Sequence, residues 1–372
     1  MILYVKETAQ LSVSNIRPWV KNTFSILPLN SLTQVSNNDI IILSAYDNSS
    51  IPNIDNYNYI IYEDAFEKLS VSIVQEYEYN HDYYYIKYAL DQAAAPTTTT
   101  LFSGSSYGAF GIIPSLFDNA VNLSSISQDL YYSINLVYAA YKKNNSIENV
   151  ILPMQYYYFY TDLSKTQNHD EQTRISKVYY PLLNDSHNCV LFPPKQNFLY
   201  ESDIFDVHSI LNTYAYGEYQ KGFFNNDRPR INYATKVWTD QSKDWSTLTE
   251  AEKYAAGRMR ASQHNECLKY EKTLFENKCI FQSFVNFCNA KNINLLIVVT
   301  PTTPYYSNEL SSNYKKDFYN ILNNTEGIIH LIDLSDSDAF SDIDFNDTDH
   351  LNRDGAIKLS TILLDTLQEI TN

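Results

Sequence analysis

Short apolar runs alternate with stretches of helical periodicity from residue 97 to the end of the chain. The runs occupy residues 97–104, 120–124, 149–154, 294–301 and 328–335. Alternation of strand-like and helical stretches is typical of a parallel sheet that helices cover on both faces. Residues 128–143, between two of the runs, have the length and spacing of a helix. The alternation predicts a three-layer α/β sandwich with a mainly parallel sheet.

The first 95 residues repeat this pattern on a smaller scale. The apolar runs at residues 1–5, 38–47 and 57–64 predict strands. Helical spacing is found at residues 13–23, 64–76 and 83–95. We therefore expect a small α/β domain at 1–95, ahead of the main domain at 96–372. The first domain has no glycine-rich phosphate-binding motif, so the sequence assigns it no nucleotide site and leaves its role open.

Two stretches of the main domain depart from the alternation. Residues 166–245 are polar, aromatic and rich in loop-forming residues. We interpret them as an insertion over the edge of the sheet. Residues 248–292 predict a long helix, with a possible break near Asn265. The chain has no internal repeat and no linker rich in proline or glycine.

Composition narrows the classes of function. The chain has 372 residues, of which 44% are hydrophobic and 15% aromatic, as expected of a folded globular protein with two or three domains. Its 27 basic and 43 acidic residues give a net charge of −16. Binding to a phosphate backbone or to anionic lipid depends on cationic side chains. The charge therefore disfavours nucleic acid and membrane surfaces as partners.

The N-terminal sequence, the apolar runs and the cysteine spacing indicate the location of the protein and the state of its cysteines. The N-terminus lacks the basic start and apolar run of a signal peptide. No segment approaches the roughly 20 apolar residues that span a bilayer. We expect a cytoplasmic protein without membrane insertion. Its cysteines show no ligand spacing, so we expect buried reduced thiols and no metal site; they are Cys189, Cys267, Cys279 and Cys288.

The first candidate for chemistry is the loop Gly104-Ser105-Ser106. Catalytic groups of an open parallel sheet gather in loops after the strands, and this loop separates a strand ending at Phe102 from a predicted helix. Gly104 permits a tight turn. Ser106 could present its hydroxyl there, close to backbone N–H groups that stabilise an oxyanion. An ordinary turn with a serine cap accounts for the same residues, so this loop alone does not decide.

The second candidate is the polar loop that precedes the last helix. A serine nucleophile needs a base, and His350 could supply it. The other nitrogen of that ring needs an acceptor, and Asp347 lies three residues before it. Asp349 is the alternative, but adjacent residues rarely orient one another's side chains, so Asp347 is preferred. A solvated acidic loop that caps the last helix is the competing interpretation.

Together the two loops resemble the SGNH (GDSL-type) hydrolases. "GSSYGAFG" at residues 104–111 is similar to the first block of that family, and "DTDHLNRDGA" at 347–356 to its last block. The last block has the form found in bacterial cell-surface polysaccharide modification proteins. The resemblance covers roughly residues 97–165 and 270–372. It implies an SGNH/flavodoxin-like fold, with Ser106 as nucleophile, His350 as base and Asp347 as orienting acid.

The sequence departs from that family at the oxyanion hole. The second family block supplies a glycine, but "NLSSISQD" at residues 122–129 has none. Backbone N–H groups of Ser106 and of the stretch from Ser125 to Ser127 would have to serve instead. The third block supplies Gly-x-Asn, and this chain has "MQYYYFY". Gln155 is then the candidate for a side-chain donor.

The resemblance also implies a substrate. It points to acyl-ester chemistry on a carbohydrate: an acetyl group transferred to, or removed from, a bacterial surface polysaccharide or its precursor through an acyl-serine. No bound cofactor is expected, and acetyl-CoA is the possible donor. The rival interpretation is a glycan-binding or assembly protein with a degenerate site. The oligomeric state is left open.

Three residues are candidates for substrate contacts: Tyr107, Tyr157 and His264. Tyr157 belongs to the run Tyr156–Tyr160, which could stack on sugar rings or simply pack at the end of a strand. His264 follows Arg260 by four residues on a predicted helix. A packed or solvated helix face is the alternative role for His264.

Overall fold

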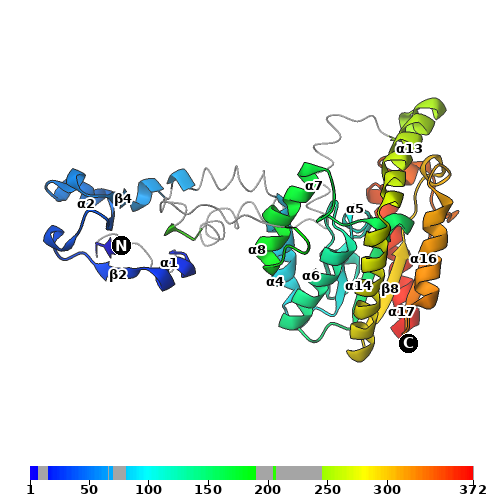
Figure 1. Cartoon of the computed structure of the whole chain (residues 1–372), viewed down its shortest axis with the longest axis horizontal. Coiled ribbons are helices and arrows are strands. Elements are labelled where there is room, and N and C mark those ends of the chain that lie inside the picture. Colours follow the sequence, from blue (N-terminus) through cyan, green and yellow to red (C-terminus); the bar gives the residue numbers. More distant parts are fainter. Residues whose placement is uncertain (7–15, 66, 70–80, 190–203, 207–244, 372) are drawn as a thin grey trace. The chain divides into compact units, whose positions relative to one another are not determined.

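The computed structural model describes residues 1–6, 16–65, 67–69, 81–189, 204–206 and 245–371. The chain divides into two compact units, Met1–His81 with Phe192–Asn226 and Asp82–Leu191 with Asp227–Asn372. Each unit contains a sheet with helices around it (Figure 1). All pairs of named strands are parallel. The α/β fold class predicted from the sequence is confirmed.

The first unit is built on a four-stranded sheet in the order β2-β1-β3-β4. Its strands are β1 (Ile2–Val5), β2 (Ser25–Pro28), β3 (Ile40–Leu43) and β4 (Tyr59–Ile61). Its helices and turns include α1 (Pro18–Thr23), η2 (Leu32–Gln34), α2 (Ala45–Ser50) and η3 (Ile54–Asn56). The core of this sheet consists of Tyr4, Leu29, Ile41, Leu43 and Ile54.

Two details of the first unit differ from the sequence prediction. The edge strand β2 was not predicted; it is short and mostly exposed, and it ends in a proline, which is unusual inside a strand. The predicted strand at 38–47 ends at Leu43, since Ser44 and Asp47 form a capping box that starts α2. Parts of the predicted helices at 13–23 and 64–76 lie outside the described residues.

The second unit has a five-stranded sheet in the order β6-β5-β7-β8-β9. The strands are β5 (Thr100–Phe102), β6 (Ala120–Asn122), β7 (Asn149–Met154), β8 (Asn294–Val299) and β9 (His330–Asp333). Each lies inside one of the five apolar runs predicted from the sequence. His330, which opens β9, is a strand residue.

The register of this sheet sorts its side chains onto two faces. Phe102 pairs with Ile151, and Ile151 with Leu296, and all three lie in one hydrophobic cluster. Their chain neighbours Leu101 and Val150 lie in the cluster on the other face. Both faces are therefore apolar, as expected of a parallel sheet that helices cover on both faces.

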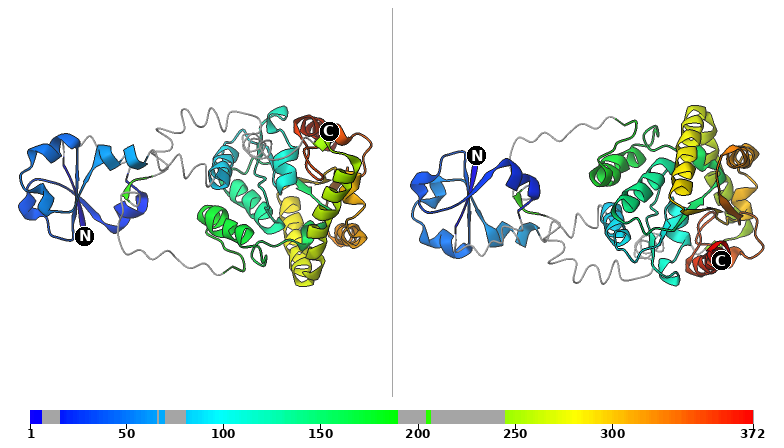
Figure 2. Two further views of the ribbon diagram at one scale, coloured as in Figure 1. Left: turned by 90° about the horizontal axis from the view of Figure 1, so that it is seen from above. Right: turned by 90° about the horizontal axis from the view of Figure 1, so that it is seen from below.

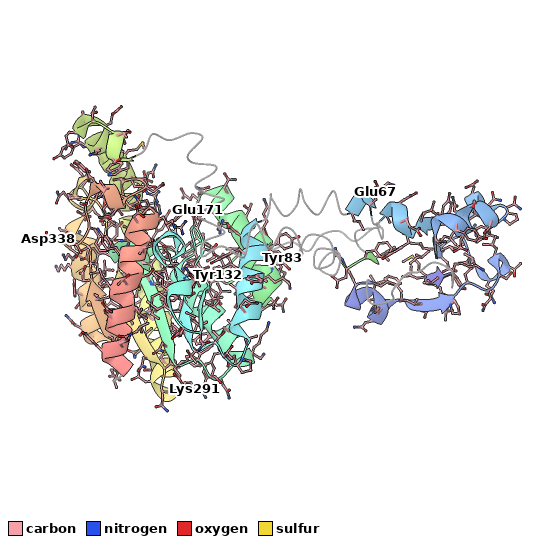
Figure 3. All side chains as sticks on the ribbon, turned by 180° about the vertical axis from the view of Figure 1, so that it is seen from behind. Glu67, Tyr83, Tyr132, Glu171, Lys291 and Asp338 are labelled. Atoms are coloured by element: carbon pink, nitrogen blue, oxygen red, sulfur yellow. The ribbon has the colours of Figure 1, made fainter. Side chains whose placement is uncertain are left out.

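Helices cover both faces of the second sheet. One face is packed by α4 (His81–Ala93), α6 (Leu130–Lys143), α14 (Glu271–Ala290) and α16 (Ser312–Asn324). The other is packed by α17 (Arg353–Thr371), whose Leu359 and Leu363 are fully buried. Figure 2 shows α14 and α17 on opposite sides of the sheet, and Figure 3 shows α17 in front of the strands. The second unit is a three-layer sandwich.

The predicted domain boundary at residue 95 has to be moved. The helix α4 belongs to the second unit, because Ile86, Leu90 and Ala93 are part of its hydrophobic core. The first stretch of the first unit therefore ends at His81. Sequence periodicity identified this helix correctly but gave no information on which sheet it packs against.

The predicted insertion at 166–245 also needs correction. Its beginning is helical, with α7 (His169–Arg174), the π-helical turn η6 (Ile175–Tyr179) and α8 (Tyr180–Leu183). The η6 side chains Ile175, Val178 and Tyr179 are buried in the core of the second unit. The stretch is thus part of that fold, while Phe205 pairs with Ile16 in the first unit. Most of the rest lies outside the described residues.

The long helix predicted at 248–292 is broken where expected. The helix α13 (Glu250–Asn265) ends at Asn265, the short turn η9 (Glu266–Lys269) follows, and α14 begins at Glu271. The prediction for the cysteines was partly wrong. All four are free thiols, but only Cys288 is buried and Cys279 is exposed. Among the described residues, no helix has the length and apolar character needed to cross a membrane.

Candidate active site

The serine loop follows β5, which pairs with β7, the middle strand of the second sheet. The strand β5 ends at Phe102, and the helix α5 (Ser106–Gly111) begins at the candidate nucleophile itself. Gly104 is required in this turn, since a Cβ there would lie 2.6 Å from the carbonyl oxygen of Pro153 in β7. The close approach of loop and strand places Ser106 at the first residue of α5, where 9% of the residue is exposed.

The structure brings Ser106, His350 and Asp347 together across 244 residues of chain. The Oγ of Ser106 lies 2.8 Å from Nε2 of His350. The Nδ1 of the same ring lies 3.0 and 3.1 Å from the two carboxylate oxygens of Asp347. A hydroxyl on one ring nitrogen and a carboxylate on the other form the arrangement that activates a serine for nucleophilic attack.

The loop that carries His350 is held by its own backbone. The Oδ1 of Asp347 accepts the N–H groups of Asp349 at 3.0 Å and of His350 at 2.8 Å. Thr303 donates its N–H and its hydroxyl to the carbonyl of Thr348, at 3.1 and 2.7 Å. These bonds fix the Asp347 carboxylate against the imidazole before any substrate binds.

Electrostatics favour a basic imidazole at this position. Burial alone would lower the pKa of His350, but the carboxylates of Asp347 and, secondarily, Asp349 outweigh it, and the pKa is raised. Burial would raise the pKa of Asp347, but the facing His350 and the loop N–H groups lower it. An imidazole with a raised pKa is a stronger base toward the serine proton, although it is neutral only at higher pH.

The helix α5 also supplies the walls around the imidazole. The ring of Tyr107 stacks on that of His350, with centroids 5.1 Å apart and 21° between the planes. The ring of Phe110 lies 5.0 Å away on the same helix. Nucleophile and ring contacts therefore come from one short helix, which restricts the imidazole to a single orientation.

Asp349, the alternative carboxylate, has a different set of partners. Its nearest oxygen is 3.7 Å from Nδ1 of His350. It accepts the hydroxyl of Tyr107 at 2.7 Å, and Nε of Arg260 lies 3.1 and 3.3 Å from its two oxygens. We call Arg260, Asp349 and Tyr107 the arginine clamp. Since Asp349 is held in this clamp, the geometry favours Asp347 as the partner of the base.

The three residues proposed for substrate contacts lie together beside the base. The hydroxyls of Tyr107 and Tyr157 are 3.1 Å apart, and the ring of Tyr157 stacks on His264 at 4.1 Å. His264 Nδ1 bonds the hydroxyl of Tyr306 at 2.6 Å. Burial, followed by the charge of Arg260, lowers the pKa of His264 to about 3, so this ring is neutral.

These contacts assign a structural role to the aromatic residues. All five side chains of Tyr156–Tyr160 are buried, so this run packs at the end of β7. The hydroxyl of Tyr107 and Nδ1 of His264 bond other protein groups. Tyr107, Tyr157 and His264 therefore build a wall of the site, and their direct contact with a substrate stays a prediction.

The expected oxyanion donors differ in whether their N–H groups already bond another protein group. The N–H of Ser125 is used, because it donates to the carbonyl of Gly104 at 3.1 Å. This bond ties the loop after β6 to the serine loop. In the described part of the chain, the N–H groups of Ser106 and Ser127 have no protein acceptor. Ser127 has φ +51°, a left-handed backbone that favours glycine.

Gln155 does not have a free donor for an oxyanion. Its amide nitrogen donates to the carbonyl oxygen of Thr300 at 2.8 Å and to the hydroxyl of Thr300 at 2.7 Å. Both amide hydrogens are therefore occupied. Gln155 was predicted to donate to an oxyanion in place of the asparagine of the SGNH hydrolases. The structure disagrees, because its amide connects the ends of β7 and β8 instead.

Among the residues that the structure describes, two groups of acidic and histidine side chains have the spacing of a metal site. They are Asp347 with Asp349 and His350, and Asp162 with His187 and Glu276. A protein cation already lies in each group. Arg260 pairs with Asp349, while Lys165 lies 2.9 Å from Asp162 and also contacts Glu276. Both groups thus fit ion pairing within the protein.

Two arginines near the site were not predicted from the sequence. Arg260 was considered only as a neighbour of His264, although the spacing of four residues places both on one helix face. Arg174 lies in the stretch interpreted as an insertion. It donates to the hydroxyl of Ser125 at 2.8 Å and pairs with Asp82. Arg174 thereby connects α7 and α4 to the loop after β6.

Comparison with known proteins adds little to this geometry. A model of an uncharacterised protein family matches residues 255–372, about a third of the chain. The matched stretch contains Arg260, Asp347 and His350 but not Ser106. No curated protein matches the chain.

Proposed function

We propose that the protein is a serine-dependent acyl-transfer enzyme with Ser106 as its nucleophile. The observation that carries the proposal is the hydrogen-bonded series from Ser106 through His350 to Asp347. A serine hydroxyl is a weak nucleophile unless a base takes its proton. His350 is within reach of that proton, and Asp347 fixes the ring tautomer that can accept it.

The proposed reaction has two steps. In the first, Oγ of Ser106 bonds to the carbonyl carbon of an ester or thioester, and its proton passes to Nε2 of His350. The N–H groups of Ser106 and Ser127 are the proposed donors to the oxyanion. The intermediate then expels the leaving group, which takes the proton from His350, and an acyl-serine remains.

In the second step an acceptor hydroxyl attacks the acyl-serine. His350 takes the proton of that hydroxyl, and the bond between the acyl carbon and Oγ of Ser106 breaks. The serine oxygen recovers its proton from His350, so the enzyme returns to its starting state. Water as acceptor gives hydrolysis, and a sugar hydroxyl gives transfer.

The proposed substrates come from the resemblance to the SGNH hydrolases. It favours an acetyl group and a bacterial surface polysaccharide or its precursor. We place the reaction in the cytoplasm, with acetyl-CoA as the donor. Two observations support transfer over hydrolysis: Ser106 is 9% exposed, and the buried rings of Tyr107 and Phe110 enclose the base. Limited access of water would prolong the life of an acyl-serine.

A fluorophosphonate probe and p-nitrophenyl acetate test the proposal on the whole protein. The wild type should bind one probe per chain and release nitrophenol, and Ser106→Ala should do neither. Ser105→Ala is the matched control, because Ser105 belongs to the same turn and its hydroxyl has no partner within the described residues. Labelling that survives Ser106→Ala would overturn the assignment.

One observation favours a second candidate function, a non-catalytic glycan-binding or assembly protein. The resemblance to the SGNH hydrolases implies a side-chain amide as a third oxyanion donor. In this chain the amide of Gln155 already donates to the two oxygens of Thr300. A wild type that binds oligosaccharide in calorimetry, yet takes up neither probe nor acetyl group, would establish this function instead.

A further inference from the structure

Two carboxylates approach one imidazole in the candidate active site, and they do so unequally. Asp347 lies 3.0 Å from Nδ1 of His350, while Asp349 lies 3.7 Å from the same atom. Asp349 is nevertheless the more deeply buried, with 2% of its side chain exposed against 34% for Asp347. A buried carboxylate next to a basic ring would normally pair with it.

The reason that Asp349 does not pair with the ring is the arginine clamp. Arg260 Nε lies within 3.3 Å of both of its oxygens, and the Tyr107 hydroxyl bonds Oδ2. Both of these contacts are shorter than the 3.7 Å that separates Asp349 from the ring nitrogen. We propose that Arg260 and Tyr107 are positioning residues, which hold Asp349 off the imidazole so that Asp347 alone orients the base.

Contacts of α13 on both sides of Arg260 hold that residue in place. The helix α13 packs so closely on α15 (Pro304–Ser307) that a Cβ at Gly257 would lie 2.2 Å from the carbonyl oxygen of Tyr305. Lys253, one turn earlier, pairs with Asp342 at 2.6 Å. His264, one turn after Arg260, bonds Tyr306 of α15. These contacts on either side fix the segment of α13 that carries Arg260.

The charges that act most strongly on His350 come from two elements. Its own loop contributes Asp347 and Asp349, and α13 contributes Arg260. His264, also on α13, is neutral because its pKa is lowered to about 3. Tyr107 on α5 is neutral because burial, followed by Asp349, raises its pKa well above the ordinary value. Loss of Arg260 would therefore leave two uncompensated carboxylates at one ring.

The consequence is a coupling between Arg260 and Asp349 that can be measured at His350. The titration of the His350 ring is followed by NMR in isotopically labelled full-length protein, with His350→Gln to assign its signals. In Arg260→Gln the midpoint should rise by about one pH unit, because Asp349 is released toward the ring. Asp349→Asn should lower the midpoint.

The double variant Arg260→Gln/Asp349→Asn separates the clamp from a direct effect of the arginine charge. When Asp349→Asn is already present, removal of Arg260 should move the midpoint by less than half as much as in the wild type. Arg260→Lys, which keeps the charge, should titrate close to the wild type. Equal shifts in both backgrounds would show that Arg260 acts on His350 without Asp349, and the proposal would be wrong.

Tyr107→Phe gives an independent test if Arg260→Gln does not fold. It keeps the ring that stacks on His350 and removes only the hydroxyl that holds Asp349. The midpoint should rise in the same direction as for Arg260→Gln but by less. An unchanged midpoint in Tyr107→Phe and in every folded Arg260 variant would reduce the clamp to a structural ion pair.

This inference rests on the proposed function only for the role of His350 as a base. The NMR titration needs no activity, so the clamp can be rejected while Ser106 still takes up the fluorophosphonate probe. A protein that shows the coupled titration but never binds the probe would retain the clamp and lose the catalytic proposal.

Discussion

The second unit contains two clusters built from the same residue types, a serine, a histidine and carboxylates. One is the candidate active site around Ser106 and His350. The other, which we call the His187 cluster, consists of Ser164, His187, Asp162, Glu276 and Lys165. Both are largely buried, and in both the serine lies within hydrogen-bonding distance of the ring, at 2.8 Å for Ser106 and 3.4 Å for Ser164.

The two clusters differ in what each ring nitrogen faces. Nε2 of His350 faces the hydroxyl of Ser106, whereas Nε2 of His187 lies 3.1 Å from Glu276. Nδ1 of His187 lies 3.5 Å from Asp162, and the hydroxyl of Ser164 donates to that same carboxylate. The serine proton is therefore directed to an acid in the His187 cluster.

The pKa of the ring does not separate the two clusters. Burial alone would lower the pKa of His187, but Asp162, Asp129 and Glu276 raise it, as Asp347 and Asp349 do for His350. With Lys165 beside it, the His187 cluster is a network of paired charges that joins the loop at 161–165 to α14. What makes the other cluster a candidate catalyst is a ring nitrogen that faces the serine instead of an acid.

The largest expected effect compares two equivalent substitutions, Asp347→Asn and Asp162→Asn. In Asp347→Asn the rate of fluorophosphonate labelling should fall by about 10⁴-fold, because the ring loses the acceptor that sets its tautomer. Its stability should fall less than that of Asp162→Asn, since the Asp347 side chain is 34% exposed and asparagine keeps the Oδ1 that accepts the loop N–H groups. The labelling rate of Asp162→Asn should match that of the wild type. Equal labelling of both variants would remove the distinction between the clusters.

The free energy of unfolding should change in the opposite order, with a larger loss for Asp162→Asn than for Asp347→Asn. Asp162→Asn removes a carboxylate that is 3% exposed and leaves Lys165 and His187 with one partner fewer. We expect the free energy of unfolding to fall by about 3 kcal/mol, as is usual when one member of a buried ion pair is removed. Urea denaturation of both variants measures this. A midpoint for Asp162→Asn at or above that of Asp347→Asn would contradict the structural role.

The pH dependence of labelling sharpens the comparison further. The base must be neutral, and the pKa of His350 is raised. The labelling rate should therefore fall as pH decreases, with a midpoint above the ordinary histidine value of about 6.5 and about a tenfold loss per pH unit below it. His187→Gln should show the same midpoint. A midpoint below the ordinary value would mean that the two carboxylates do not control the base.

The sequence predicted those parts of the molecule that depend on local pattern. The five strands of the second sheet lie inside the five strand candidates that alternate with helical stretches in the sequence. The serine loop was found because it lies between a predicted strand and a predicted helix. The histidine loop was found because Asp347 lies three residues before His350, just ahead of the last predicted helix. β2 was missed because it is short and mostly exposed and ends in a proline.

The parts that sequence reasoning missed depend on contacts between distant segments. Arg260 and Asp349 are 89 residues apart, and the spacing of Arg260 and His264 shows which helix face they share but not what that face meets. Helix α4 was assigned to the wrong unit for the same reason. Gln155 was proposed as a donor from its position alone, and its neighbour Thr300, 145 residues away, decides otherwise.

The smallest expected effect concerns Ser127, where local backbone conformation and residue type disagree. Its φ of +51° is a left-handed conformation that costs a residue with a Cβ about 1 kcal/mol. Ser127→Gly should therefore raise the free energy of unfolding by about 0.5 kcal/mol, since the gain is partly offset by the greater freedom of glycine in the unfolded chain. Labelling should persist, because the proposed oxyanion donor is the backbone N–H, which glycine retains. Ser127→Ala is the control: it removes the hydroxyl but keeps the Cβ, and its stability should stay close to that of the wild type. If thermal unfolding shows that the alanine variant gains as much as the glycine variant, then the hydroxyl and not the backbone is responsible. The backbone conformation would then not be a reason to expect glycine at position 127.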